Sequence, residues 1–271
     1  MTKEETLQQM KQTLEQKVTE VATNSEEFQE FLLFYTKNFP QYSFRNRMLI
    51  YAQNKVATHV AGFHKWSSLG YRIKRGAKAL VIYAPIKRKE EEEVKFFFPV
   101  RVFDDTQVEA TEKAIPLPHL DTSLQKDSKT TYPISLLYTN TKEVIEKKLG
   151  KKIRYYTPTG AENGKTDGKE IWLKKREEVA MLGTLVHEYV HYLFHFEKER
   201  SPRNQEEVEA ELGAMIFGSL FHLDIERKYL YLHCYQEGVS LLEAFEKVLP
   251  AIESLVREVE ENMLTQKEEK L

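Results

Sequence analysis

The stretch REEVAMLGTLVHEYVHYLFH, residues 176–195, decides how the second half of this chain folds. Its apolar residues recur at helical spacing. Glu177 and Glu178 fall in the expected first turn, where the helix dipole favours acidic side chains. Within this stretch, residues 187–191 read His-Glu-Tyr-Val-His. Histidines four positions apart lie on one face of a helix, one turn apart, so both imidazoles can reach one ion.

His187, Glu188 and His191 have the spacing of the HExxH motif, which predicts a zinc site. The two histidines are the candidate ligands, and Glu188 is the candidate catalytic base, placed to take a proton from metal-bound water. The alternative is a solvated helix that carries these residues by accident. The motif lies among apolar residues, however, and burying two histidines without partners is unfavourable. Three histidines over two turns cannot all reach one ion, so His195 is expected behind the ligands or at the surface.

A second helical run, residues 205–215, is expected to supply the third ligand. Glu207 and Glu211 share one helical face with two alanines, and such a face of small residues should turn inward. Glu207 is therefore the predicted metal ligand. Glu211, one turn further on, could accept the second N–H of a ligand histidine. Glu209 remains an alternative third ligand.

Length and composition predict two domains of ordinary size in a soluble, cytoplasmic protein. The chain has 271 residues, a mean hydropathy of −0.55 and a single cysteine, Cys234. One cysteine allows no intrachain disulfide, which fits a reducing compartment. The N-terminus has no apolar signal segment, and no run of 18 apolar residues occurs, so no membrane association is expected.

Charge is distributed unevenly along the chain. Residues 31–89 contain no Asp or Glu, although the whole chain contains 42 acidic residues. The same stretch is rich in Lys, Arg and aromatic residues. Cations that follow phosphates and rings that stack on unpaired bases are what single-stranded nucleic acid requires. The alternatives are an aromatic core with lysines outside it, or a surface for an acidic protein partner.

Residues of this basic stretch are the candidates for contact with single-stranded DNA. Strands expected at 71–73 and 79–83 flank a glycine-containing turn, which would place three cations at a hairpin tip. Tyr42 and Trp66 could stack on bases or belong to the core. The candidate residues are Tyr42, Arg45, Asn46, Arg47, Lys65, Trp66, Arg72, Lys74, Arg75 and Lys78.

The predicted fold class is α+β with two domains. Residues 1–108 form an α+β nucleic-acid-binding domain, residues 109–131 a polar linker, and residues 132–271 a mostly helical domain with a small sheet. A short strand at 169–173 precedes the metal helix and could form the edge against which an extended peptide substrate pairs.

Many positions between residues 39 and 107 resemble the N-terminal domain of the ArdC antirestriction family. They are Tyr42, Asn46, Leu49, Ile50, Gln53, Val60, Gly62, Trp66, Leu69, Gly70, Lys74, Gly76, Lys78, Ile82, Pro85, Val102, Phe103, Asp104 and Gln107. Three positions depart from the pattern: Ala77 and Ala79 stand where Glu and Gly are common, and Thr106 where Ser is usual. This resemblance implies single-stranded DNA binding in a conjugative element.

The second half resembles the zincin domain of the same family, related to the ImmA/IrrE metallopeptidases. The motif at 187–191 and the acidic helix from Glu207 to Glu211 carry this resemblance. It implies a zinc metallopeptidase with an unknown protein substrate. Candidate oxyanion donors are Tyr155, Tyr156, Tyr189, Tyr192 and His222. Two further hypotheses remain: a DNA-coating protein with a structural or vestigial zinc site, and a regulatory protease that cleaves a repressor.

Overall fold

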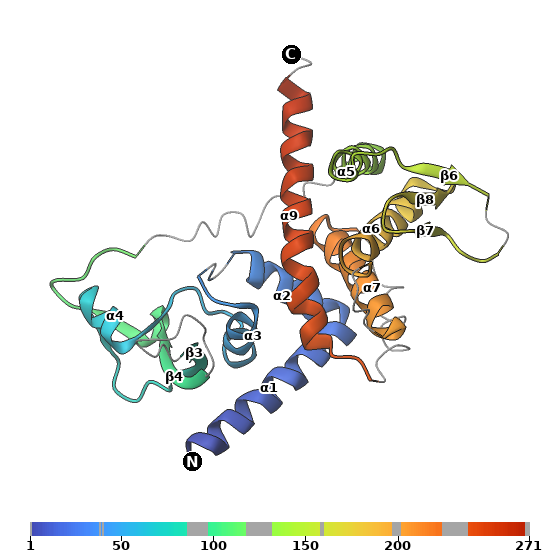
Figure 1. Cartoon of the computed structure of the whole chain (residues 1–271). Coiled ribbons are helices and arrows are strands. Elements are labelled where there is room, and N and C mark those ends of the chain that lie inside the picture. The colour runs from blue at the N-terminus through green and yellow to red at the C-terminus, as the bar shows by residue number, and fades with distance from the viewer. Residues whose placement is uncertain are drawn as a thin grey trace, which may run out of the picture. The chain divides into compact units, whose positions relative to one another are not determined.

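The chain forms two compact units, Met1–Asp127 and Ser128–Leu271, each with its own helices and strands (Figure 1). The computed structural model describes residues 2–37, 39, 41–85, 97–117, 132–157, 160–196, 202–223 and 238–268. Cys234 and residues 118–131 of the expected linker lie outside these residues. In the described part of the chain, no helix combines the length and apolar character needed to span a bilayer.

Three helices begin the N-terminal unit: α1 (Lys3–Thr23), α2 (Ser25–Lys37) and α3 (Phe44–Gln53). A capping box starts α1, in which the N–H of Glu5 donates to the Thr2 hydroxyl and the N–H of Thr2 donates to the Glu5 carboxylate. Aromatic rings fill the space between α2 and α3, with Phe31 and Tyr51 edge to face at 5.3 Å. Many aromatic residues of the basic stretch are therefore core residues.

The described strands of this unit form two antiparallel sheets. One has the order β1-β4-β3, formed by β1 (Val60–Gly62), β4 (Phe97–Asp104) and β3 (Leu80–Pro85). The other pairs β2 (Tyr71–Ile73) with β5 (Val108–Ala110). The expected hairpin of 71–73 with 79–83 is therefore wrong: residues 74–79 connect two different sheets. Gly76, at φ 83°, marks the turn correctly, but a local turn signal does not identify the partner strand.

The N-terminal unit continues past residue 108, its expected end. Beyond β5, the N–H of Thr111 donates to the Gly70 carbonyl at 3.0 Å, and the N–H of Ile115 to the Leu69 carbonyl at 2.9 Å. These bonds attach the segment to the end of α4 (Phe63–Ser68). The expected start of the linker at 109 is therefore too early, because a polar composition does not reveal backbone pairing.

The described residues of the C-terminal unit form the helices α5 (Ile134–Leu149), α6 (Glu178–Phe194), α7 (Arg203–Leu220) and α9 (Leu241–Glu268). α6 packs on α5 and α7, and α9 packs on α5 and α7. Gly213 lets α7 approach α6 closely, since a Cβ there would lie 2.5 Å from Val190 Cγ2. The expectation that the face of small residues on α7 turns inward is confirmed, since Ala210 and Ala214 are both buried.

A three-stranded sheet packs against α6 in the order β6-β8-β7. It consists of β6 (Arg154–Tyr156), β7 (Gly164–Thr166) and β8 (Ile171–Lys174). β8 is the strand expected before the metal helix, but it is central, parallel to β6 and antiparallel to β7. The expected peptide-binding edge is therefore not β8. The edge strand that packs on α6 is β7.

Candidate metal centre

Helix α6 fixes the two histidines of the motif. Its apolar side is fully packed, with Leu185, Val186 and Val190 each 0% exposed. His187 and His191 lie one turn apart and keep partial solvent exposure. The burial of one side of α6 therefore sets the direction of the histidine pair, as the amphipathic pattern predicts.

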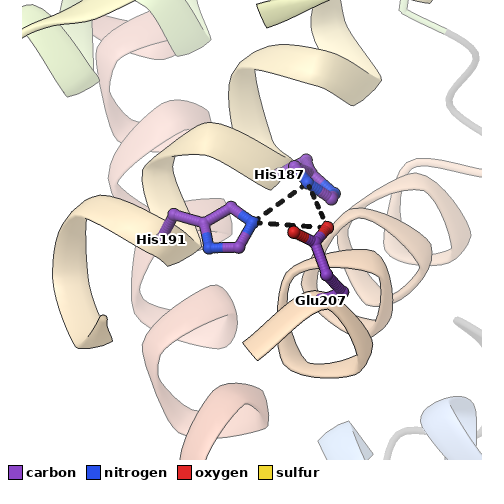
Figure 2. Close-up of side chains that lie close together, drawn as sticks. All are labelled: His187, His191 and Glu207. Atoms are coloured by element: carbon purple, nitrogen blue, oxygen red, sulfur yellow. Dashed lines mark hydrogen bonds and ion pairs between the residues drawn. The ribbon is translucent and has the colours of Figure 1, made fainter. Parts of the chain in front are cut away.

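Helix α7 brings a carboxylate to the same point. The Nε2 atoms of His187 and His191 are 3.1 Å apart, and Glu207 Oε2 lies 3.6 Å from the first and 3.7 Å from the second. Figure 2 shows the three side chains directed toward one another, the histidines from α6 and Glu207 from α7. Their ligand atoms all lie within 4.8 Å of one another, an arrangement that could hold a metal ion.

Two neighbouring glutamates face different sides of this cluster. Glu211 Oε1 lies 3.1 Å from His187 Nδ1, although the ring N–H is not aligned on that oxygen. Glu209 is 3% exposed and turns toward His195, its Oε2 lying 2.9 Å from His195 Nε2. The structure thus brings Glu207, and not Glu209, to the histidine pair.

A cleft of about 770 Å³ opens beside the cluster. Its lining includes all three cluster residues, Glu188, and the three residues of β7. Glu188 is 7% exposed, and burial raises its pKa, opposed by the nearby His187 and His191. For Glu207 the contact with His191 prevails over burial and lowers the pKa. The cleft therefore places an additional carboxyl group beside the potential ligands.

Behind His191 lies a set of buried contacts, of which the sequence predicted only the part made by His195. His195, expected behind the ligands or at the surface, is 2% exposed, with its Nδ1 2.7 Å from His191 Nδ1. Glu209, on the far side of His195, also pairs with Lys247 of α9 at 2.6 Å. The repeated four-residue spacing of the histidines signalled His195. No sequence pattern pointed to Lys247, because only the packing of α9 brings it to Glu209.

The cleft does not contain the expected oxyanion donors. None of the five candidates, Tyr155, Tyr156, Tyr189, Tyr192 and His222, lines it. The Tyr155 hydroxyl pairs with the Tyr138 hydroxyl at 2.8 Å, and Tyr189 is 3% exposed. Arg203 does line the cleft, 3.9 Å from Glu207.

Several predicted DNA contacts of the N-terminal unit are structural instead. Trp66 is 1% exposed, and its Nε1–H donates to the Phe103 carbonyl, so it belongs to the core and cannot stack on a base. Arg47 is buried and donates to the carbonyls of Tyr35 and Tyr42. Sequence could not separate these buried residues from surface ones, because both uses favour aromatic and basic side chains.

Two other candidates also serve the fold. Asn46 pairs with both backbone groups of Tyr83, its amide donating to the carbonyl and accepting from the N–H, each at 2.8 Å. The Tyr42 hydroxyl donates to the Val60 carbonyl at 3.0 Å. Asn46 therefore ties α3 to β3, and Tyr42, in the turn before α3, contacts β1.

The remaining six candidates are exposed. They are Arg45, Lys65, Arg72, Lys74, Arg75 and Lys78. Arg72 pairs with Glu109 across β2 and β5, and Lys74 donates to the Thr106 carbonyl. An exposed ring that was not among the candidates, Phe63, begins α4 beside Lys65 and is 58% exposed.

Fold and site together define a two-unit α+β protein with a His-His-Glu cluster in a cleft of its second unit. A model of the "N-terminal domain of anti-restriction factor ArdC" matches residues 2–176, more than half of the sequence. The chain therefore belongs to the ArdC antirestriction family. The matched region extends beyond the N-terminal unit, as far as β8 and the start of the segment leading to α6.

Two crystal structures of the antirestriction ArdC protein from the R388 plasmid are similar to this chain at 16% sequence identity. The Mn(II)-bound structure has a TM-score of 0.47 and covers 82% of this chain and 85% of its own. The metal-free structure has a TM-score of 0.42, with coverage of 83% and 86%. No curated protein matches the chain.

Proposed function

We propose that this ArdC-family protein binds single-stranded DNA through its N-terminal unit and is a zinc-dependent peptidase in its C-terminal unit. The observation that carries the proposal is the convergence of His187, His191 and Glu207 beside Glu188 in one cleft. Its role would be antirestriction, or protection of DNA, during transfer of a mobile element, as the family suggests.

The donor set suits zinc. Two imidazoles and one carboxylate are the protein ligands of many catalytic zinc sites, which leave a further position open. Other divalent ions accept the same N and O donors, so zinc is proposed on ligand type. When bound, zinc supplies Lewis-acid polarisation of a peptide carbonyl. The lowered pKa of Glu207 keeps its carboxylate ionised, as a ligand must be.

Glu188 is the proposed general base. It follows His187 directly and lines the cleft, yet it is not among the three residues that could hold the ion. A structural zinc site needs no base and closes its fourth position. The carboxylate would take a proton from the attacking water and return it to the leaving amine.

Strand β7 is the proposed docking edge for the substrate. Gly164, Lys165 and Thr166 all line the cleft, and β7 pairs only with β8 among the described strands. An extended peptide that added to this edge would run past Glu188. Substrate recognition would then depend mainly on backbone hydrogen bonds.

The N-terminal unit offers cations and a ring for single-stranded DNA. Lys74, Arg75 and Lys78 are exposed on one short connection between β2 and β3. Phe63, with Lys65 two residues on, replaces Trp66 as the proposed stacking residue. Cations along a backbone path and an exposed ring are the two elements that sequence-tolerant binding uses.

One observation favours a second function, a DNA-coating protein whose metal site is not catalytic. None of the candidate oxyanion donors lines the cleft. On this hypothesis the protein would shield incoming DNA from nucleases by covering it, and Glu188 would be dispensable.

The variant Glu188→Gln separates these functions. In the peptidase function, hydrolysis of an unfolded protein such as denatured casein should fall by about 10²–10⁴-fold, the usual contribution of a general base. DNA protection would fall with it. Glu162→Gln, in the same cleft but outside the cluster, is the matched control. Unchanged DNA protection by the Glu188 variant would favour the coating function. If the protein is instead a protease specific for a repressor, the wild type would cleave that repressor but not denatured casein in the same assay.

DNA binding is tested with a fluorescent single-stranded oligonucleotide over a salt series, beside a duplex of equal length. We expect tighter binding to the single strand and a steep fall in affinity with salt. Absence of binding would exclude the DNA function and leave the basic stretch as a surface for an acidic protein.

A further inference from the structure

A chain of four polar side chains leads from the metal cluster into the core of the C-terminal unit. His191 Nδ1 contacts His195 Nδ1 at 2.7 Å, and His195 Nε2 contacts Glu209 Oε2 at 2.9 Å. Lys247 Nζ lies 2.6 Å from the same oxygen of Glu209. We propose that His195 is a positioning residue of the metal centre, held by Glu209 and Lys247, a role that rests on the proposed metal site.

With a metal on His191 Nε2, the contact between the two Nδ1 atoms determines which nitrogens carry protons. His191 points its Nε2 toward His187 and Glu207, so in the metal-bound state that atom must be unprotonated. Its proton then resides on Nδ1 and is donated to His195 Nδ1. His195 must accept at Nδ1 and carry its own proton on Nε2, which donates to Glu209. Each of these hydrogen bonds then has one donor and one acceptor, and both are donated in the direction from His191 toward Glu209.

Glu209 is itself held in place on both oxygens. Its Oε1 accepts a hydrogen bond from Gln205 Nε2 at 2.8 Å, and Oε2 receives His195 and Lys247. With both oxygens paired and the side chain 3% exposed, the Glu209 carboxylate has little freedom to move and can orient the His195 ring.

Packing of α6 against α7 does not by itself explain why His195 and Glu209 are buried between these helices. His195 is 2% exposed and Glu209 3%, and burying such groups is costly unless every polar atom is paired. Apolar side chains of similar size could join α6 to α7 at least as well. What an imidazole provides is an acceptor for the N–H of His191, the usual task of an outer partner of a metal-bound histidine.

The series of contacts from His191 to Lys247 also connects the metal centre to α9. Lys247 comes from α9, and the N–H of Ser240, just before α9, donates to Gln205 Oε1 at 3.1 Å. The C-terminal helix thus contributes to the orientation of a ligand that lies on α6. Loss of Lys247 should make Glu209 less rigidly held. Because Glu209 acts on His191 only through His195, zinc binding should weaken less than it does when His195 is lost.

The test is zinc affinity, measured on the full chain by competition with a chromophoric chelator. We expect His195→Ala to weaken zinc binding by about 10–100-fold, the usual effect of losing an outer-shell partner. His195→Gln should recover part of this loss, because its amide can accept from His191 and donate to Glu209. Lys247→Met should weaken binding less than His195→Ala. His64→Ala, an exposed histidine of the other unit, is the control and should bind as wild type does.

The outcomes separate this inference from the proposed function. Failure of wild type to bind zinc would remove the proposed metal site itself. Wild-type affinity in His195→Ala, or equal losses in the Ala and Gln variants, would overturn the positioning role. Nitrogen NMR of zinc-loaded wild type gives a second reading that needs no variant. A proton on His195 Nε2, with Nδ1 bare, is expected, and the opposite tautomer would overturn the inference.

Discussion

Gly164 of β7 lies directly against Glu188 of α6. A Cβ at position 164 would lie 3.0 Å from Glu188 Oε1 and 2.9 Å from its Cγ. It would also lie 2.6 Å from Thr184 Cγ2, one turn earlier on α6. The absence of a side chain at 164 therefore allows the edge strand to approach the proposed base.

Gly164→Ala should impair catalysis without impairing metal binding. The added methyl must displace Glu188 or move β7 away from it, and a displacement of about 1 Å at a reacting group can cost roughly 10²-fold in rate. The three atoms nearest to the new methyl belong to Thr184 and Glu188 rather than to a proposed ligand, so zinc affinity should be kept. The peptidase rate measures catalysis, and chelator competition on the same sample measures zinc affinity. Gly160→Ala, with open space around its Cβ, is the matched control.

Replacing Glu207 should remove a ligand, whereas replacing other carboxylates of the cleft should not. We expect Glu207→Gln to weaken zinc binding by more than the roughly 10–100-fold typical of outer-shell residues. Zinc should raise the thermal midpoint of wild type by mass action and raise that of the variant little. Glu162→Gln lines the same cleft and should resemble wild type. A normal zinc response in Glu207→Gln would require a different third ligand.

Removing the three cations between β2 and β3 should weaken DNA binding for every sequence. Each phosphate contact on a single strand contributes about 0.7 to the slope of log affinity against log salt. Replacing Lys74, Arg75 and Lys78 with Ala should therefore reduce the slope by about 2. Lys11→Gln is the control, because Lys11 is an exposed cation of α1 outside the candidate set. An unchanged slope in the triple variant would locate the DNA surface elsewhere.

Glu27 should make the N-terminal unit sensitive to acid. Burial by itself would raise the Glu27 pKa, but Lys17 and Lys55 outweigh it and lower the pKa from 4.5. Its stabilising effect is therefore fully present above about pH 4.5, the unfolded value, and is lost as the pH falls through the lower folded value. At neutral pH we expect Glu27→Gln to reduce the free energy of unfolding by about 1–2 kcal/mol.

The measurement needs a probe for one unit alone. The two tryptophans lie in different units, so a Trp172→Phe background leaves Trp66 to report unfolding of the N-terminal unit. Urea midpoints of Glu27→Gln and its parent should converge as the pH falls below 4.5. Glu26→Gln, an exposed neighbour, should follow the parent throughout. Parallel curves for Glu27→Gln and its parent would show that the ion pairs contribute no stability.

Local patterns were sufficient for the two helices of the metal cluster and for the centre of the site. Helical spacing placed His187 and His191 on one face, and the small-residue face of the next helix brought Glu207 to them. Both are short-range properties, because the period of a helix fixes which residues share a face. The turn at Gly76 was equally visible in the sequence.

Long-range pairing was not visible in the same way. β2 pairs with β5 rather than with the strand that follows it, and β8 proved to be central rather than an edge. The choice between Trp66 as a stacking residue and as core also depended on which elements cover it. Strand partners and burial arise from contacts between distant segments, which a local pattern does not encode.

The sequence by itself determined the helix that carries the histidine pair, the position of Glu188 beside that pair, and the acidic helix that completes the cluster. Only the tertiary structure decided that Glu209 turns away to hold His195, that Lys247 of α9 reaches Glu209, and that Gly164 faces Glu188. The physical reason is that helical periodicity sets the direction of a side chain on its own axis. The packing of α6, α7, α9 and β7 against one another sets what each side chain meets.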